Sequence, residues 1–412
     1  MKFLRNFLDK IEPSKDKKLL HTVFDGFATF LFTPKETTSL GVHIRDGIDL
    51  KRTMVMVVLA LQFCLLFGMW NIGHQHYLAL GLHTGLGEAL FTKFFYGMFQ
   101  LLPIIIVAHV VGLGVEFWFA AQKGHPIEEG FLVSGMLIPL IMPPDLPLWM
   151  LAISIVFAVV FAKEAFGGTG MNILNIALTA RVFVFFAYPT DISGDICWVS
   201  YDYNILHQIF GMESATVAAL GLSAVPETFR TLVVDGWTGA TPLGLAAKGG
   251  WAAVTEHYSA SDIFFGFIPG SVGEVAKPAI LLGLVMLIAI GVASWRIMLS
   301  MLAGAVVTGL IFNYFGGNAF LEVPFYYHLI MGSFLFALVY MATDPVTAAQ
   351  TPTGKLWYGF FIGVVGMIVR VLNPAYPEGW MLAILFMNVF APLIDHYIIQ
   401  GNIKKRLARV SN

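Results

Sequence analysis

Residues 53–73, TMVMVVLALQFCLLFGMWNIG, decide the fold, because this run contains no charged side chain and is long enough to cross a membrane. A helix needs about 20 mostly apolar residues to span the ~30 Å hydrocarbon core of a bilayer. The whole chain shares this character, with 57% hydrophobic and 12% charged residues and a mean hydropathy of +0.76. Soluble domains carry about 25% charged residues. The sequence therefore predicts an all-α polytopic membrane protein whose partners include membrane lipids and no nucleic acid.

Ten ranges meet this criterion, so we expect about ten transmembrane helices. They form two groups of five around a polar interval. The third range is short and flanked by Pro126 and by Pro143-Pro144, which favours a broken or re-entrant helix. The ranges are approximately 53–73, 95–120, 128–142, 147–164 and 171–188 in the first group, and 278–294, 297–315, 325–343, 356–373 and 378–398 in the second.

The basic residues orient these spans. Ten of the 24 Lys and Arg residues lie within residues 1–52, and four more lie within 404–409. Because Lys and Arg collect on the cytoplasmic side, both termini are expected in the cytoplasm. An even number of spans agrees, and it places the polar interval outside a bacterial cytoplasmic (inner) membrane. The first long apolar run begins only at Thr53, so we expect no signal peptide.

The spans divide the chain into regions. Two groups of five spans would have opposite orientations, as in proteins built from inverted repeats. Ser134-Gly135 before Pro143-Pro144 is echoed by Gly332-Ser333 before Asp344-Pro345, but the spacings drift, so two inverted five-helix repeats stay a hypothesis. The regions are a cytoplasmic basic segment (1–52), the first membrane half (53–188), an outer loop (189–277), the second half (278–398) and a cytoplasmic basic tail (399–412).

Ionisable groups within apolar spans are costly and mark functional sites. Glu116, Asp344 and Asp395 lie near predicted cytoplasmic helix ends, and their hard oxygen ligands suit the path of a small hard cation. The alternative is that each is a helix-end residue among lipid headgroups. Arg181 and Arg370 are interpreted as partners of backbone carbonyls or carboxylates, because a buried guanidinium needs such acceptors.

The remaining polar residues support no bound metal. Cys64 and Cys197 are too few for a disulfide framework or a multi-cysteine metal site, so both are expected to be free thiols. His109, inside the second range, is interpreted as a packing residue rather than a ligand.

Asn172 and Asn175 open the fifth range and are three residues apart, so they would share a helix face. Two carboxamides on one face can meet the donor and acceptor edge of a flavin ring. Helix capping or helix packing is the alternative role.

The outer interval contains DGWTGAT at residues 235–241. It resembles the sequence at which a dedicated transferase esterifies the phosphate of FMN to a threonine in the Rnf and sodium-pumping NADH:quinone reductase families. The resemblance makes Thr241 the acceptor and Asp235, Gly239 and Ala240 its surroundings. Pro242 biases Thr241 towards extended backbone, which would present its side chain. An ordinary turn of small residues is the alternative.

The end of this interval, IPGSVGE at 268–274, resembles a family stretch near the flavin. Backbone amides at Ser271 and Gly273 could contact phosphate or ring oxygens. A plain loop before a helix is the alternative.

Further motifs extend the resemblance along nearly the whole chain, to the B subunit of the sodium-translocating NADH:quinone reductases. They are RDGIDLKR at 45–52, KEAFGGTG at 163–170, FAYP at 186–189, ATDP at 342–345 and NPAYPEG at 373–379.

The resemblance implies a redox phosphoprotein. It would carry covalent FMN at Thr241 and noncovalent riboflavin near Asn172 and Asn175, would pass electrons to ubiquinone or menaquinone, and would move Na⁺ outward. It implies other subunits as partners and the flavin transferase for maturation. The chain has no dinucleotide-binding GxGxxG unit, so NADH would be oxidised on another subunit. An outer FMN and an inner riboflavin would lie ~30 Å apart.

The resemblance places quinone near Gly112 and Leu113, although the family pattern has adjacent glycines there, and Leu113 would narrow any groove. The basic N-terminal segment, also assigned to this site, could instead be a membrane-surface anchor.

Two other functions stay open. The D subunit of the Rnf complex shares the flavinylated threonine and the ten-span plan but runs from ferredoxin to NAD, and the long basic segment before the first span disfavours it. A transporter or channel without redox chemistry is the second alternative.

Overall fold

The computed structural model describes residues 50–123, 130–168, 170–192, 197–373 and 378–410, together with isolated positions before residue 50. Within these ranges every regular element is a helix, which confirms the predicted all-α class. The predicted basic segment 1–52 lies almost entirely outside the described residues.

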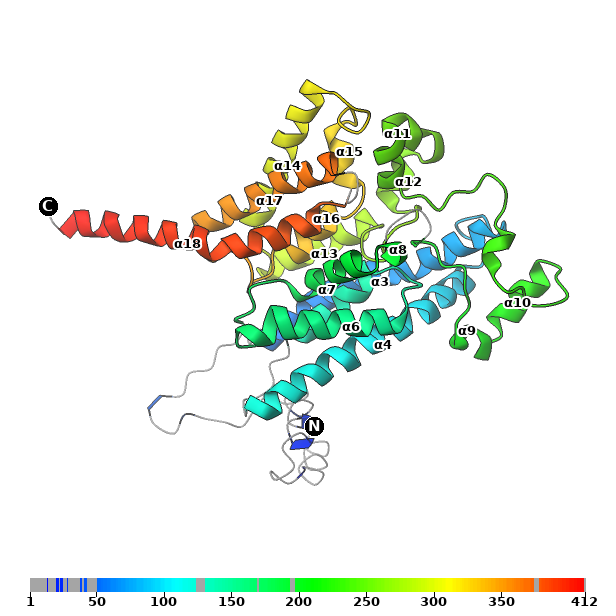
Figure 1. Ribbon diagram of the computed structural model, residues 1–412, viewed down its shortest axis with the longest axis horizontal. Helices are drawn as coiled ribbons and strands as arrows, with labels where there is room; N and C mark the ends of the chain where they lie inside the picture. Colours follow the sequence, from blue (N-terminus) through cyan, green and yellow to red (C-terminus); the bar gives the residue numbers. More distant parts are fainter. Residues whose placement is uncertain are drawn as a thin grey trace.

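The first half contains five apolar helices that pack side by side (Figure 1). The last turns of the fourth candidate span widen into a π-helical segment, η1 (Val159–Lys163), and then tighten into a 3₁₀ turn, η2 (Glu164–Phe166). The helices are α3 (Leu50–Ala79), α4 (Leu90–Lys123), α5 (Phe131–Ile141), α6 (Leu148–Ala158) and α7 (Ile176–Ala187).

The polar interval forms short helices. Most of them lie toward the end of the bundle opposite to the C-terminus (Figure 1). They are α8 (Pro189–Ile192), α9 (Ile205–Ile209), α10 (Met212–Ala219), η3 (Phe229–Leu232), α11 (Pro242–His257) and α12 (Ala260–Phe265).

The second half, like the first, contains both long helices and interrupted ones. Its eighth candidate span is interrupted at Met331–Ser333 and ends in a second π-helical segment, η4 (Ala337–Met341). The other elements are α13 (Lys277–Ile290), α14 (Trp295–Phe315), α15 (Phe325–Ile330), α16 (Phe334–Phe336), α17 (Pro352–Leu372) and α18 (Trp380–Val410).

Each of the ten predicted apolar ranges contains helix, and six helices are long and apolar enough to cross a membrane. α5, α7 and α13 are shorter. The eleven residues of α5 span only about 16 Å, so this helix is too short for a full crossing, as its flanking prolines suggested. The chain is a polytopic membrane protein, and the exact number of crossings stays a prediction.

The two halves share an order of packing. In both, the second candidate span packs on the fourth and the fourth on the fifth, through the pairs α4–α6 and α6–α7, then α14–α17 and α17–α18. Glycines allow α14 and α17 to pack closely, since side chains added at Gly304 and Gly363 would overlap the opposing backbone. This shared order supports the repeat hypothesis.

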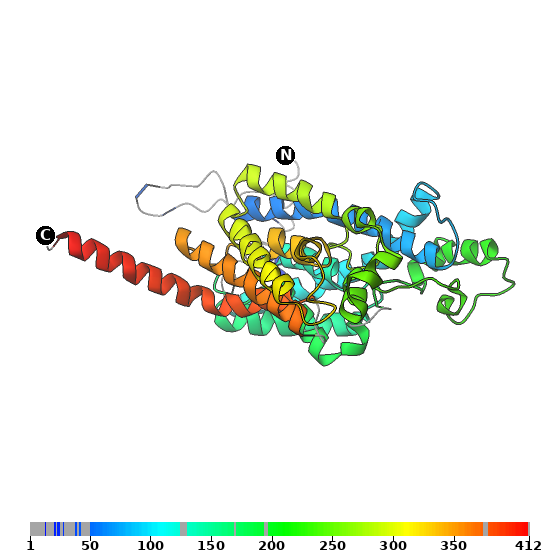
Figure 2. The ribbon, with the colours of Figure 1, turned by 90° about the horizontal axis from the view of Figure 1, so that it is seen from above.

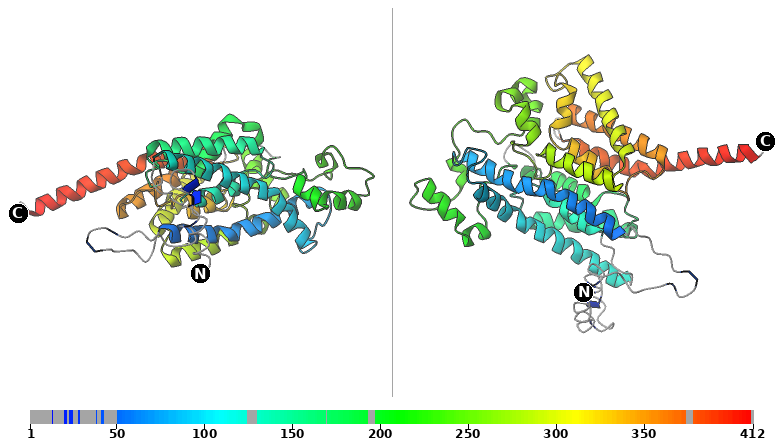
Figure 3. Two further views of the ribbon diagram at one scale, coloured as in Figure 1. Left: turned by 90° about the horizontal axis from the view of Figure 1, so that it is seen from below. Right: turned by 180° about the vertical axis from the view of Figure 1, so that it is seen from behind.

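The last helix is longer than its predicted range. α18 continues past residue 398 to Val410 and includes most of the basic tail, while the membrane boundary expected at residue 398 stays a prediction. Its C-terminal part projects alone beyond the bundle (Figures 2 and 3).

Candidate functional site

Thr241 is the N-cap residue of α11. Its backbone is extended, with φ −71° and ψ 151°, as the following proline predicted. The Thr241 Oγ1 accepts a hydrogen bond from the Gly244 amide at 3.1 Å. The side chain is half-buried. A group esterified to this oxygen would therefore sit at the N-terminus of α11, where the helix dipole favours negative charge.

Thr241 opens into a small cleft of about 30 Å³, called here the outer cleft. Its walls include the loop before α13, and the Ser271 hydroxyl in that wall is buried with no hydrogen-bond partner among the described residues. A buried polar atom without a partner is costly and indicates an absent ligand or water. The lining residues include Trp198, Thr241, Ser271, Glu274, Lys277, Gly332 and Glu378.

Buried charges surround the outer cleft. Arg181 forms an ion pair with Glu378 and lies 3.9 Å from Glu274. Lys277 Nζ donates to the carbonyls of residues 274 and 275, both at 3.0 Å. Burial raises the pKa of Glu274 to about 7, and the nearby Glu378 charge acts in the same direction.

Arg370 adds a second buried cation to this region. Its Nη1 donates to two carbonyls at the end of α15, while Nε and Nη2 have no partner in the described structure. A side chain added at Gly332, in the cleft wall, would lie 3.2 Å from Nη2. The guanidinium therefore lies directly behind that wall.

The chemistry of these residues suits an anionic group such as the phosphate of FMN. A phosphoryl group on Thr241 would meet the N-terminus of α11 and the Lys277 ammonium, both of which favour an anion. Trp198 offers an aromatic wall. The unpartnered Ser271 hydroxyl supplies a donor.

The other residues predicted around FMN have different positions. Asp235 is exposed on a turn, and Gly239 and Ala240 lead directly to Thr241. Gly273 is not among the lining residues of the outer cleft. Its amide donates to the Leu140 carbonyl, and an added side chain would press on Phe336, so Gly273 packs its loop onto α5.

A second threonine has nearly the same local geometry as Thr241. Thr351 caps α17 within the sequence TPTG, as Thr241 caps α11 within TPLG, and both hydroxyls accept from a glycine amide at 3.1 Å. The Thr351 hydroxyl also donates to Asp395 at 2.5 Å. The Thr351 hydroxyl is therefore engaged by a carboxylate, whereas no carboxylate bond is found for the Thr241 hydroxyl in the described part of the chain; the choice of Thr241 as acceptor stays a prediction.

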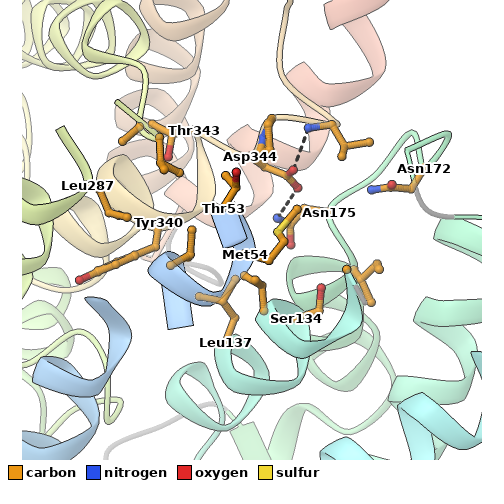
Figure 4. Close-up of a pocket in the computed structure, with 18 of the residues that line it drawn as sticks. Thr53, Met54, Ser134, Leu137, Asn172, Asn175, Leu287, Tyr340, Thr343 and Asp344 are labelled. Carbon is orange, nitrogen blue, oxygen red and sulfur yellow. Dashed lines mark hydrogen bonds between the residues drawn. The ribbon is translucent and has the colours of Figure 1, made fainter. Parts of the chain in front are cut away.

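A second cavity of about 70 Å³, called here the inner cleft, lies between the halves (Figure 4). It contains residues from the start of α3, from α5, from the segment before α7, and from both π-helical segments. The lining residues include Thr53, Ser134, Lys163, Asn172, Asn175, Tyr340, Thr343 and Asp344.

Both predicted riboflavin residues line the inner cleft, but the prediction that they share a helix face is wrong. Asn172 and Asn175 precede α7, which begins at Ile176. Asn175 is its N-cap and accepts from the Leu178 amide at 3.1 Å, so capping fixes the helix start here. The Asn175 amide also donates to Asp344 at 3.1 Å (Figure 4). The capping alternative is thus confirmed for Asn175.

The three predicted ion-path carboxylates are distributed around this end of the molecule. Asp344 lines the inner cleft, and Glu116 forms an ion pair with Lys163, which also lines it. Asp395 instead accepts from the amides of Gln350 and Thr351 and ties α18 to the start of α17. Among the described residues, no three His, Cys, Asp or Glu side chains group as a metal site.

Gly112 and Leu113, predicted near quinone, lie in α4 and line none of the three cavities identified in the described residues. A side chain added at Gly112 would overlap the buried ring of Phe131. Gly112 therefore allows α5 to approach α4, and Leu113 is partly buried against the core.

The interpretation of the buried arginines is confirmed. Arg181 donates to the Ile141 carbonyl and to Glu378, and Arg370 donates to carbonyls at a helix break. His109 Nδ1 donates to the Ile105 carbonyl, one turn earlier, at 2.9 Å, as expected for a packing residue.

One helix connects the two clefts. Lys277, at the start of α13, lines the outer cleft, and Leu287 lines the inner one. Ten residues of α-helix rise about 15 Å. Residues that line the two clefts are therefore separated along α13 by less than the ~30 Å thickness of the hydrocarbon core.

Comparisons with known proteins show the family of the chain. A family model described as the NQR2, RnfD, RnfE family matches residues 37–404. The chain belongs to this family. It is 42% identical to the B subunit of the Na(+)-translocating NADH-quinone reductase of Chromohalobacter salexigens, over 98% of this chain and 96% of the relative. It is 40% identical to the proteins of the same name from Ectopseudomonas mendocina and Azotobacter vinelandii, over 98% of this chain and 99% of each relative.

These relatives are subunits of an enzyme complex, so the resemblance seen in the sequence is confirmed. Two residues that line the clefts were not singled out as site residues by sequence reasoning. Lys277 carried no signal beyond its place at a helix start, and Lys163 was visible only as a charge closing an apolar range.

Proposed function

We propose that this chain is the membrane subunit of a Na⁺-pumping NADH:quinone oxidoreductase, with FMN esterified to Thr241 and riboflavin in the inner cleft. The observation that carries the proposal is the capping hydroxyl of Thr241 at the mouth of a cleft with a buried ammonium and an unpartnered hydroxyl. Relatedness to proteins named as the B subunit of this reductase supports the substrates, quinone and Na⁺.

When bound, the flavins would supply the electron-carrying chemistry, and the chain's own residues would hold them. Lys277 and the start of α11 would bind the phosphate, and Trp198 would flank the ring. In the inner cleft, Asn172 would remain available to a neutral ring, since its amide makes only a 3.5 Å contact with the Leu174 carbonyl. The Asn175 side chain already accepts a hydrogen bond from the Leu178 amide of α7 and donates one to Asp344.

In this proposal, Na⁺ would enter near Glu116, Asp344 and Asp395, at the end of the molecule that contains the inner cleft. Glu116 and Asp344 border the inner cleft directly or through Lys163, while Asp395 would act by holding the loop that follows Asp344. The quinone assignment to Gly112 and Leu113 rests on the resemblance, and the inner membrane location with cytoplasmic termini rests on the basic residues. The matching family model also covers RnfD, so ferredoxin:NAD chemistry is the second candidate.

The acceptor is tested by comparing Thr241→Val with Thr238→Val, each produced in cells that make the flavin transferase. Denaturing electrophoresis should show a fluorescent flavin band in the wild type and in Thr238→Val, and none in Thr241→Val. Loss of the N-cap hydroxyl costs about 1 kcal/mol, so the chain should still fold. A fluorescent band retained in Thr241→Val would contradict the assignment. Quinone-reductase activity of the assembled complex separates the two candidate functions.

A further inference from the structure

Arg370 of α17 has hydrogen-bond donors that its surroundings do not use. The residue is fully buried, and its Nη1 donates to the carbonyls of His328 and Met331 at 2.6 and 3.1 Å. Nε and Nη2 have no hydrogen-bond partner in the described part of the chain. The ring of Trp380 lies 5.2 Å from the guanidinium carbon. A buried guanidinium without an anion is costly, so the two remaining donors indicate that an acceptor belongs beside them.

Gly332 is the residue that separates Arg370 from the outer cleft. It lines that cleft, and its backbone has a φ of +64°. A Cβ atom at this position would lie 3.2 Å from Arg370 Nη2 and 3.1 Å from the Leu243 side chain of α11. Because glycine has no side chain, an acceptor in the cleft can approach Nη2 across this position. The same opening faces the start of α11, two residues after Thr241.

The size and charge of the outer cleft suit a small anion. A volume of about 30 Å³ is enough for about two water-sized groups, which matches phosphate oxygens and is too small for a flavin ring. Thr241, at the N-terminus of α11, and the Lys277 ammonium both lie in the wall, and both favour negative charge. Arginine adds a planar set of donors that can bind two phosphate oxygens at once.

We propose that the outer cleft is a phosphate-binding site in which Arg370 is a binding residue and Gly332 is the opening through which Nη2 reaches the anion. The inference rests on the proposed function, in which the anion is the phosphate esterified to Thr241. Arg370 would contact that phosphate and not the flavin ring. A residue of the second membrane half would thus hold a group attached to the polar interval.

Phosphate binding is tested without flavin, on the complex purified from cells that lack the flavin transferase. Thermal unfolding of this chain is measured with increasing inorganic phosphate, at an ionic strength kept constant with NaCl. A ligand that binds the folded state stabilises it by mass action, so phosphate should raise the melting temperature of the wild type. Arg370→Met should need about tenfold more phosphate, or more, for the same shift. Arg370→Lys keeps the charge and should lie between the two.

Gly332→Ala tests the opening while leaving every charge in place. It should weaken the response to phosphate as Arg370→Met does, and in cells that make the transferase it should lower the fraction of chain with covalent flavin. Gly316→Ala is the matched control, because Gly316 has a φ of +62° and nothing within 4 Å of its added side chain. It should keep the wild-type phosphate response and flavin content.

A wild type that phosphate does not stabilise would overturn the inference. So would a wild-type phosphate response in Arg370→Met or in Gly332→Ala, because a general effect of the salt acts equally on all variants. The proposed function fails separately. If phosphate stabilises the wild type through Arg370 but the transferase attaches no flavin to the chain, the anion site stands and the flavin assignment is refuted.

Discussion

At the scale of single residues, the two clefts differ in which polar side-chain atoms already have hydrogen-bond partners. Thr241 and Thr351 have the same capping geometry, yet only Thr351 donates to a carboxylate. Lys277 and Arg370 are buried beside the outer cleft without a direct carboxylate hydrogen bond in the described structure. The chemistry expected at each cleft follows from which polar atoms remain available.

Gly112→Ala tests whether the glycine in α4 serves packing. The added methyl group would overlap Phe131, so we expect a loss of about 1–3 kcal/mol in the free energy of unfolding. Gly114→Ala is the control, since nothing lies within 4 Å of that position, and it should be neutral or stabilising by up to about 1 kcal/mol. Thermal unfolding in detergent measures both. Equal stability of the two variants would remove the packing role.

The sequence predicted which residues would gather at the inner cleft better than it predicted their conformation. Asn172 and Asn175 do line one cavity, but on a segment before α7 rather than on a helix. Spacing alone could not show this, because the N-cap bond of Asn175 depends on where α7 begins. The pairing of Glu116 with Lys163 joins residues 47 positions apart, and no local pattern reveals it.

At the scale of helices, the predicted ranges were correct in position and less so in length. Hydropathy identified α5, α7 and α13 but did not predict that these helices have only 11, 12 and 14 residues, because a short apolar helix and a long one have the same composition. The π-helical segments were not predicted, since their sequences, VVFAK and ALVYM, resemble ordinary helix.

The attachment of α9 to α4 should depend on pH through His207. His207 Nε2 contacts the Tyr96 carbonyl at 2.9 Å, and Nδ1 accepts from the Asn204 amide at 3.1 Å, so the neutral ring donates from Nε2. Burial lowers the pKa of His207 below 6.5. A group whose pKa is lower in the folded state than in the unfolded state stabilises the protein at pH values above its unfolded-state pKa. This stability is lost as the pH falls through the folded-state pKa.

The wild type should therefore melt at a lower temperature at pH 5 than at pH 7.5, and this difference should shrink in His207→Gln, which cannot become charged. His257→Gln, at an exposed position of the same outer region, is the control and should behave like the wild type. An unchanged difference in His207→Gln would show that the ring does not link pH to stability.

At the scale of the whole molecule, α3 connects the two functional ends. Thr53, near its start, lines the inner cleft, and His76, near its end, contacts the Ser200 carbonyl and the Tyr203 hydroxyl of the outer region, both at 2.8 Å. The region with Thr241 thus lies toward the end opposite to the projecting C-terminus (Figure 1). The sidedness that charge patterning predicts stays a prediction, and the short path along α13 required the three-dimensional structure.

The mass of the intact chain, purified from cells that make the flavin transferase, tests the central claim most directly. Under denaturing conditions the mass should exceed that of the sequence by one FMN less one water, and digestion should place the increment on the peptide containing Thr241. A second flavin should be released on denaturation without a mass increment. An unmodified Thr241 peptide, or an increment on another residue, would contradict the account.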